Sequence, residues 1–315
     1  MYFKILICKK IIYILTMSFD YRLKRINNIT KKWKLNKIHP LITSYKINKV
    51  VFEEFKFNLK LYISKAMSIN FNESDKKFIH NVDRARSNRI NITPNGAIVP
   101  KREYHLEYNM VLRSWCELIK LITKNDKKLL KLFRITPNIR VKFGREISEN
   151  KNRELSTSVP HSDAWVEGPW GMNCFIPFLG DINNNNLRFY EPKHLFEDRF
   201  LKDSPSYKKM QWVLKYYKPI NRIVPKIGHV HFSDYAAIHN TFRKKNCGTR
   251  ISIDTTIFVG NHLPHKDRIK EYTKKIPSIG LDQFIDSGQY EKDKPANKLS
   301  TYSHYTSKVL KVINF

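Results

Sequence analysis

The sequence Pro160-His161-Ser162-Asp163-Ala164-Trp165 places an imidazole and a carboxylate two residues apart. In an extended segment, side chains two residues apart lie on the same face of the strand. His161 and Asp163 are therefore predicted to point together and to converge on one metal ion. A chain with 11 histidines contains such a pair by chance, so the prediction depends on further ligands elsewhere in the sequence.

A second imidazole, His239, lies 78 positions after His161 (239 − 161). Two imidazoles and one carboxylate on one face of an ion leave three positions open, which is the arrangement of non-haem iron(II) oxygenases. His161, Asp163 and His239 are thus the predicted metal ligands and the predicted catalytic group. His229 and His231 share a strand face just before His239 and are rival ligands. His239 is favoured because it lies at the strand end with an arginine behind it.

That arginine is found 11 positions after His239 (250 − 239), in Thr249-Arg250-Ile251-Ser252. A guanidinium can bind a carboxylate through two parallel hydrogen bonds, and Ser252, on the same strand face, can add a third. Arg250 and Ser252 are therefore predicted to anchor the remote carboxylate of a dicarboxylic oxoacid. Arg140 and Arg188, on neighbouring predicted strands, are the alternative anchors.

The spacing of apolar residues predicts helices first and strands afterwards. Steps of three and four residues predict an amphipathic helix over 103–122, and a mixed period predicts a mostly helical segment over 43–68. A short helix is predicted over 127–133, and the polar span 74–102 is predicted to be loop or short strands. Apolar runs and alternation then predict strands near 139–143, 173–178, 186–190, 230–232 and 251–257, interrupted by a helical insert over 204–217.

The 2-oxoglutarate/iron(II) oxygenase superfamily has a set of motifs that this sequence resembles: His161-x-Asp163, then His239, then Arg250-x-Ser252. The resemblance covers residues 138–260, and within the superfamily the sequence is similar to the phytanoyl-CoA hydroxylase-like branch. His229 departs from the family pattern, because an acidic residue commonly follows the glycine that Gly228 matches. The insert over 204–217 is a second departure.

The resemblance implies an α+β protein with a double-stranded β-helix core (jelly-roll, cupin-like) and supporting N-terminal helices. It implies residues 1–137 as a mostly helical support region, 138–260 as the catalytic core and 261–315 as a basic C-terminal extension. The implied cofactors are iron(II), the cosubstrate 2-oxoglutarate and dioxygen. The implied reaction is hydroxylation of a small metabolite, such as an amino-acid, sugar or secondary-metabolite intermediate, since Asp163 occupies the position that halogenases leave to chloride.

Several residues near the motifs are further candidates for the site. Asn173 is predicted to bind the cofactor close to the metal. Trp165 and Trp170 are expected either to line the pocket or to pack in the core, because large aromatic side chains do both. Arg140 and Lys142 are expected to face either the pocket or solvent.

The composition carries a formal net charge of +30, with 58 Lys and Arg against 28 Asp and Glu. Such an excess suggests nucleic acid as a partner, but the charges are spread from Lys4 to Lys311 without a basic block. Nucleic-acid demethylases of the superfamily also have a second arginine where this chain has Thr256. The expected partner is therefore a small-molecule substrate. A cupin-type metalloprotein without oxidative chemistry and a non-catalytic basic nucleic-acid-binding module stay open as alternatives.

The four cysteines form no C-x-x-C pair, so a reduced, cytoplasmic protein is expected. The apolar run over residues 1–17 is split by Lys9-Lys10, and neither half reaches the about 20 apolar residues that span a bilayer. No transmembrane segment is therefore predicted. Met1 and Met17 are both possible starts.

Overall fold

The computed structural model of the protein describes residues 19–260 apart from 88–90, 125, 127, 135, 145–153 and 222, together with residues 284–286. The N-terminal apolar run, and all but three residues of the basic C-terminal extension, lie outside the described residues. Among the described helices, none has the combined length and apolarity needed to cross a lipid bilayer.

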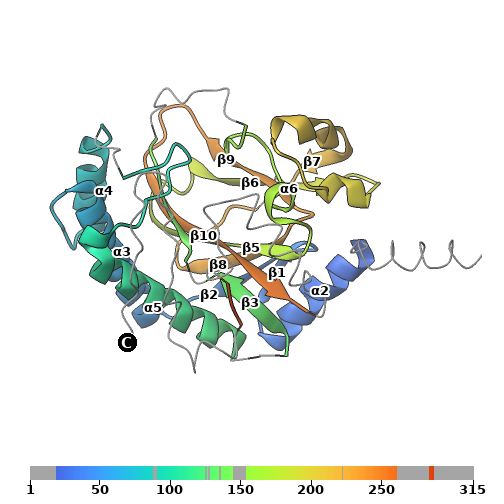
Figure 1. Ribbon diagram of the computed structural model, residues 1–315, viewed down its shortest axis with the longest axis horizontal. Coiled ribbons are helices and arrows are strands. Elements are labelled where there is room, and N and C mark those ends of the chain that lie inside the picture. Colours follow the sequence, from blue (N-terminus) through green and yellow to red (C-terminus); the bar gives the residue numbers. More distant parts are fainter. Residues whose placement is uncertain are drawn as a thin grey trace, which may run out of the picture.

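The described residues form two antiparallel sheets, a larger and a smaller one (Figure 1). The larger sheet has eight strands, in the order β1 (Asn36–His39), β2 (Ile42–Lys46), β8 (His229–Asp234), β5 (Gly171–Gly180), β10 (Arg250–Val259), β3 (Leu130–Arg134) and β11 (Phe284–Asp286), with β4 (Asn138–Lys142) also paired to β10. The smaller sheet has the order β7 (Tyr217–Pro219), β6 (Asn185–Pro192) and β9 (Ile238–Arg243).

The side chains of strand β10 point alternately to the two faces of the larger sheet. Ile251, Ile253 and Ile257 are fully buried in the main hydrophobic core. Arg250 and Asp254, at alternate positions, line a cavity on the opposite side. Because the side-chain period of a strand is two, one ten-residue strand supplies both the core and the cavity.

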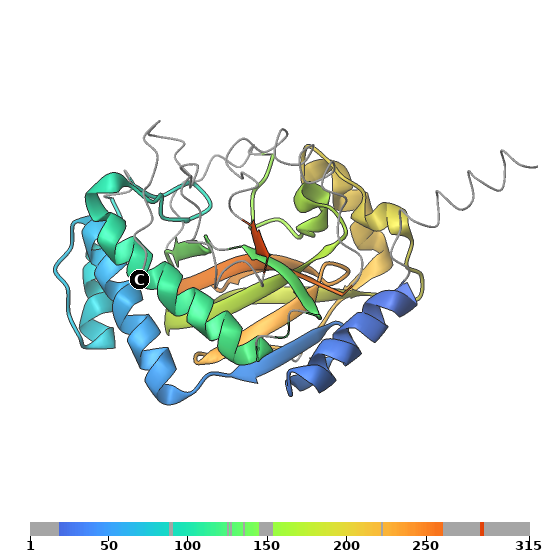
Figure 2. The same ribbon diagram turned by 60° about the horizontal axis from the view of Figure 1, so that its bottom comes forward.

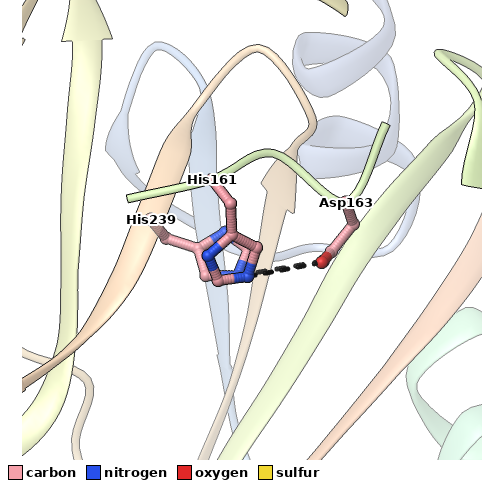
Figure 3. Close-up of side chains that lie close together, drawn as sticks. All are labelled: His161, Asp163 and His239. Carbon is pink, nitrogen blue, oxygen red and sulfur yellow. Dashed lines mark ion pairs between the residues drawn. The ribbon is translucent and has the colours of Figure 1, made fainter. Parts of the chain in front are cut away.

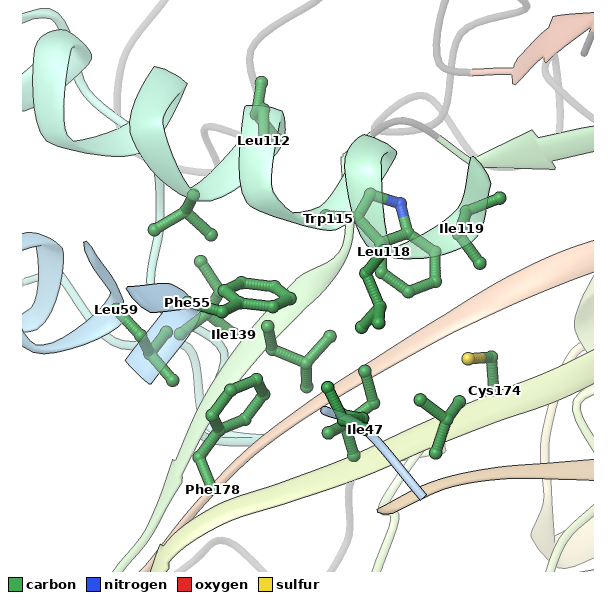
Figure 4. Packing of buried hydrophobic residues seen from close by; sticks show 14 of the residues in the cluster. Ile47, Phe55, Leu59, Leu112, Trp115, Leu118, Ile119, Ile139, Cys174 and Phe178 are labelled. Atoms are coloured by element: carbon green, nitrogen blue, oxygen red, sulfur yellow. The ribbon is translucent and has the colours of Figure 1, made fainter. Parts of the chain in front are cut away.

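Helices cover the outer side of the larger sheet (Figure 2). α3 (Lys49–Met67) packs against α5 (His105–Thr123), and the short helix α4 (Asp75–Arg84) lies beside them. Figure 4 shows the side chains of Trp115 and Leu118 on α5 pointing toward Cys174 on β5. These helices therefore form a support behind the sheet, and they leave its other side open to the smaller sheet.

Helix α2 (Phe19–Lys32) is attached to the larger sheet by buried charge. Arg22 donates to Asp234 at the end of β8 over 2.9 Å, and Arg25 pairs with the other oxygen of the same carboxylate. Arg25 also donates to the carbonyl of Trp170 over 2.7 Å. Both guanidiniums keep the pKa of Asp234 below its usual range, although burial acts in the opposite direction.

The predicted α+β class is confirmed: helices and antiparallel sheets are both present. The helix predicted over 103–122 corresponds to α5, and each predicted strand has a counterpart. The segment 43–68 is helical from residue 49 onward, whereas Ile42–Lys46 form strand β2. β1, β2 and β3 all come from the first 137 residues and pair into the same sheet as β8 and β10.

Two element predictions were wrong in part. The helix predicted over 127–133 is strand β3 in its second half, because Phe133 pairs with Ile257 of β10 and a short apolar run has no decisive period of its own. The span 74–102 contains helix α4, which buries Phe78 and Val82 one turn apart. The insert predicted to be helical over 204–217 is helical: it forms the 3-10 helix η3 (Lys208–Tyr216), followed by β7.

Candidate active site

A cavity of about 210 Å³ lies between the two sheets. Its walls come from β3, β4, β5 and β10 of the larger sheet and from β6 and β9 of the smaller sheet. The loop and short helix α6 (Ala164–Glu167) between β4 and β5 also contribute. The lining is largely polar: Arg134, Asn138, Arg140, Lys142, Thr157, Asp163, Glu167, Asn173, Arg250, Asp254 and Thr256 all contribute. Leu155, Val166, Phe175 and Leu187 supply its apolar side chains, and the ring of Tyr207 also lines it.

His161, Asp163 and His239 converge at one wall of this cavity (Figure 3). Nε2 of His161 lies 3.8 Å from Asp163 Oδ1, and Nε2 of His239 lies 3.8 Å from Asp163 Oδ2. One candidate ligand atom from each residue lies within 4.8 Å of the other two. Ligand bonds of about 2 Å place neighbouring ligand atoms about 3 to 4 Å apart, so the donor set fits one divalent ion.

Main-chain pairing brings the two histidines together. His161 donates its backbone N–H to the carbonyl of His239, and His239 donates to the carbonyl of His161, both over 2.8 Å. This bridge attaches the loop before α6 to strand β9. It explains how two residues 78 positions apart (239 − 161) share a site.

The route by which Asp163 reaches the site differs from the one expected. His161 lies in a β-bridge, but Asp163 has helical angles (φ −61°, ψ −22°) and is the N-cap residue of helix α6. Ser162 stabilises this turn, since its Oγ donates to the carbonyl of Tyr235 over 2.7 Å and accepts from the N–H of Ala164. The convergence therefore comes from a strand-to-helix turn and not from a common strand face.

His161 is prepared to act as a ligand. Its Nδ1 lies 2.7 Å from the carbonyl of Val159, which makes Nδ1 the proton donor and leaves the Nε2 lone pair toward Asp163 and His239. Burial lowers the pKa of His161 well below its usual value, and the neighbouring His239 lowers it further. A neutral imidazole is the form that binds a metal.

Asn173 contacts the predicted metal ligand Asp163. Its Nδ2 donates to Asp163 Oδ2 over 2.7 Å, and its Oδ1 is buried without a hydrogen-bond partner among the described residues. Asn173 can therefore orient the carboxylate and still accept one bond from a bound molecule. Such contacts behind a metal ligand commonly set ligand orientation and affinity.

Arg250 lines the cavity and is buried to 1% exposure. Its Nε and Nη1 atoms have no hydrogen-bond partner among the described residues, and neither has Ser252 Oγ. Burial lowers the pKa of Arg250 to about 9. Unsatisfied buried donors cost free energy, so a carboxylate that accepts from them would be strongly favoured.

The two alternative anchors are placed differently. Arg140 lines the cavity, but its guanidinium is paired with Asp254, with Nη2 3.0 Å from Oδ1, and also donates to the carbonyl of Asn95. Arg188 is exposed and lies over the ring of Phe242 at 3.8 Å. Of the three arginines, Arg250 is therefore the best placed to bind the remote carboxylate of a dicarboxylic oxoacid.

The remaining candidates divide between core and cavity. Trp165 and Trp170 are not among the lining residues and pack in hydrophobic clusters. His229 and His231 are not part of the convergent group. Lys142 lines the cavity and donates to Thr157 over 2.9 Å.

Glu167 lines the cavity and belongs to none of the sequence motifs. Its Oε2 accepts from Tyr235 over 2.6 Å and from Thr256 over 2.5 Å, and its Oε1 lies 3.6 Å from Arg134 Nη1. Burial raises the pKa of Glu167, and the Arg134 guanidinium acts against that rise. Its position four residues after Asp163 was the available signal, because residues four apart share one helix face.

No protein-family model matches the chain, and no curated protein matches it. Solved structures that are similar include the non-heme alpha ketoglutarate dependent epimerase SnoN from nogalamycin biosynthesis, with 10% identity and a TM-score of 0.39 over 76% of this chain and 90% of that chain. The carbocyclase SnoK from the same biosynthesis has 9% identity and a TM-score of 0.38, over 73% of this chain and 83% of that chain. An N-substituted L-amino acid dioxygenase from Burkholderia ambifaria has 12% identity and a TM-score of 0.34, over 70% and 86%. At TM-scores below 0.5 these similarities carry no weight for function, which has to be inferred from the residues of this chain.

Proposed function

We propose that this protein is an iron(II)- and 2-oxoglutarate-dependent oxygenase of the double-stranded β-helix superfamily. One observation carries the proposal: a convergent His-Asp-His group and a buried arginine with unsatisfied donors line the same small cavity. A metal-binding group alone fits many activities. The added carboxylate anchor points to a metal chelated by an oxoacid.

His161, Asp163 and His239 would bind the iron, since two imidazoles and one carboxylate with open positions suit non-haem iron(II). Arg250 and Ser252 would bind the remote carboxylate of 2-oxoglutarate. Together, bound iron(II) and 2-oxoglutarate would supply the reductive activation of dioxygen, with release of succinate and carbon dioxide and transfer of an oxygen atom to the substrate. The side chains named above would orient these groups within a polar cavity.

The sheet arrangement agrees with this proposal. We assign the larger and smaller antiparallel sheets to the two sides of a double-stranded β-helix, with residues 138–260 as its catalytic core, 1–137 as its support and 261–315 as an extension. β10 would then be the last core strand, because it carries the anchor and is flanked by β5 on one edge and by β4 and β3 on the other. The phytanoyl-CoA hydroxylase-like branch remains our assignment within the superfamily.

The lining favours a small polar metabolite as the substrate, and hydroxylation as the reaction. A cavity of about 210 Å³ with amide, carboxylate and guanidinium side chains suits a molecule with several hydrogen-bonding groups. It suits a long acyl chain poorly, because few apolar side chains line it. Nucleic acid is not the expected partner despite the net charge of +30. We also propose a cytoplasmic location, because the four cysteines form no C-x-x-C pair.

An anaerobic titration tests the proposal without knowledge of the substrate. Iron(II) is added to the apoprotein, followed by 2-oxoglutarate, and the metal-to-oxoacid charge-transfer absorption is recorded. We expect a saturable band that requires both additions, and slow succinate release once air is admitted. Metal binding without this band would favour a non-oxidative cupin-type protein. Absence of metal binding, with salt-dependent nucleic-acid affinity, would favour a basic binding module.

A further inference from the structure

We propose that Tyr207 is a positioning residue for His161, and that the segment 204–217 holds the metal-binding loop, residues 160–165, in place. The inference relies on the proposed function only in taking His161 as a metal ligand. This segment is the insert that departs from the family pattern, and no role for it follows from the motifs. Its contacts in the structure provide one.

The ring of Tyr207 stacks on the imidazole of His161. Their centroids lie 4.3 Å apart with an angle of 18° between the planes, and both residues are buried, with exposures of 7% and 2%. The hydrogen bond from Nδ1 to Val159 restrains the edge of the imidazole. The stacked phenol restrains its face, so the two contacts together define the direction of the Nε2 lone pair.

Hydrogen bonds attach the segment to both ends of the stretch that contains His161 and Asp163. At one end, Gln211 Nε2 donates to the carbonyl of Pro160 over 2.9 Å. At the other end, the N–H of Ser204 donates to the carbonyl of Trp165 over 2.8 Å. The metal-binding stretch is therefore held at the residue before His161 and at the second residue after Asp163.

The position of Tyr207 within the segment is restrained as well. Its N–H donates to the carbonyl of Glu154 over 2.9 Å, and its carbonyl accepts from Gln211 Nε2 over 2.8 Å. Its ring meets Trp165 edge-on, with centroids 6.1 Å apart. Gln211 thus bonds to the stacking residue and to the metal-binding loop at once.

Apolar packing also holds the segment 204–217 in place. Met210 and Val213 of the segment are buried in one cluster with Trp165 and Ile238. Trp165 follows Asp163 by two residues, and Ile238 directly precedes His239. The cluster therefore joins the segment to both elements that carry the predicted ligands. A free loop over the cavity would lack this packing.

The stacked ring, and not the hydroxyl, is the part of Tyr207 that the proposal requires. Tyr207→Phe keeps the ring, so its metal affinity should stay within about twofold of wild type. Tyr207→Leu removes the stacked face, and Tyr207→Met does so with a more flexible side chain. Both should weaken metal binding by about 10- to 100-fold, the usual range for contacts that orient a metal-ligating histidine.

Trp212→Leu is the matched control. Trp212 belongs to the same segment but is 38% exposed and packs on Phe200, away from His161. Its loss disturbs the insert without removing the stack, so metal affinity should stay near that of wild type. Thermal unfolding of each apoprotein shows which variants remain folded. Tyr207→Met takes the place of Tyr207→Leu if the latter does not fold.

The experiment is an anaerobic cobalt(II) titration without 2-oxoglutarate, read by the visible absorption of the bound ion. We expect the Leu and Met variants to bind more weakly and with an altered cobalt spectrum, and the Phe and Trp212 variants to match wild type. Unchanged affinity and spectrum in the Leu and Met variants would overturn the positioning role. An equal loss in the Phe variant or in the Trp212 variant would also overturn it. Wild-type protein that binds cobalt but gives no charge-transfer band with iron and 2-oxoglutarate would refute the proposed function alone.

Discussion

His161 is restrained at its backbone, at Nδ1 and at its ring face before any metal binds. Its N–H and carbonyl pair with His239, its Nδ1 lies 2.7 Å from the carbonyl of Val159, and its ring stacks on Tyr207. Burial keeps it neutral by lowering its pKa. A ligand that is already oriented and deprotonated loses little freedom when it binds, so this residue contributes affinity as well as a donor atom.

The metal site can be tested by removing its ligands one at a time. His161→Ala and Asp163→Ala should each reduce iron affinity by well over the roughly 100-fold that loss of a contact behind a ligand causes. Iron bound per protein after anaerobic dialysis measures the effect, and circular dichroism reports the fold. His229→Ala is the matched control, because this rival histidine lies outside the convergent group. Retained iron in both ligand variants would contradict the assignment.

Arg250 has one proposed task, to bind the remote carboxylate of 2-oxoglutarate. Arg250→Ala leaves that carboxylate unpaired, so the expected loss is about 2 to 5 kcal/mol, or roughly 30-fold to several thousandfold in affinity for 2-oxoglutarate. Arg250→Lys should restore part of it, since an ammonium keeps the charge without the planar fork.

Uncoupled succinate release against 2-oxoglutarate concentration gives the half-saturation of each Arg250 variant. Iron binding should remain in all of them. Arg188→Ala is the control, because Arg188 is exposed and outside the cavity. If the half-saturation of Arg250→Ala equals that of wild type, Arg250 is not the anchor.

At the scale of elements, strand β10 contributes side chains both to the hydrophobic core and to the candidate site. Its buried isoleucines pack in the core that α3 and α5 cover, and its alternate residues carry the anchor Arg250 and the carboxylate Asp254. Helix α2 fixes strand β8, which pairs with β5 on the same sheet, through the buried ion pairs of Asp234. Helices outside the cavity therefore determine how rigidly its walls are placed.

Asp234 links α2 to β8, and Asp234→Ala should destabilise the protein by about 3 to 5 kcal/mol because two buried guanidiniums lose their partner. Urea unfolding of the apoprotein measures the change. Glu117→Ala removes an exposed pair with Arg113 on α5 and should cost at most about 0.5 kcal/mol. Equal effects of the two substitutions would show that the buried pairs do not attach α2 to the sheet.

At the scale of the whole molecule, stability depends on several buried titratable groups with opposite effects. Burial lowers the pKa of His161, and that of His231 to about 3. Burial raises the pKa of Glu167, while paired guanidiniums lower those of Asp234 and Asp254. The histidines make the apoprotein sensitive to mild acid, whereas the paired aspartates matter only below about pH 4.

His231 allows this pH dependence to be tested apart from the metal ligands. Its folded-state pKa lies below the unfolded value of 6.5, so below pH 6.5 the unfolded chain binds more protons and stability falls as pH falls. The loss is at most about 1.4 kcal/mol per pH unit for this group between about pH 6.5 and 4.5. Urea unfolding of metal-free wild type and His231→Gln across this window should show a flatter dependence in the variant. Because Glu167 acts in the opposite direction in both proteins, only the difference between them is diagnostic, and identical slopes would refute the prediction.

The sequence was enough to predict the helix α5 and strands at β4, β5, β6, β8 and β10, and to propose the set His161, Asp163, His239 and Arg250. Short-range periodicity predicts the elements, because amphipathic faces depend on side chains close together in the chain. The proposed site residues came from their type and order, which resemble a known set of motifs. The structure brings the three predicted ligands to one point, and it leaves the donors of Arg250 unsatisfied in the same cavity.

Other features depended on contacts between distant segments and could not be predicted from the sequence. Strand β3 exists because it pairs with β10, with Phe133 opposite a residue 124 positions later (257 − 133). The stack on His161 comes from Tyr207, 46 positions later (207 − 161), and the partners of Glu167 come from β8, β10 and β3 and their ends. No local period or motif specifies such pairs, because the free energy that selects them arises only when the segments pack together.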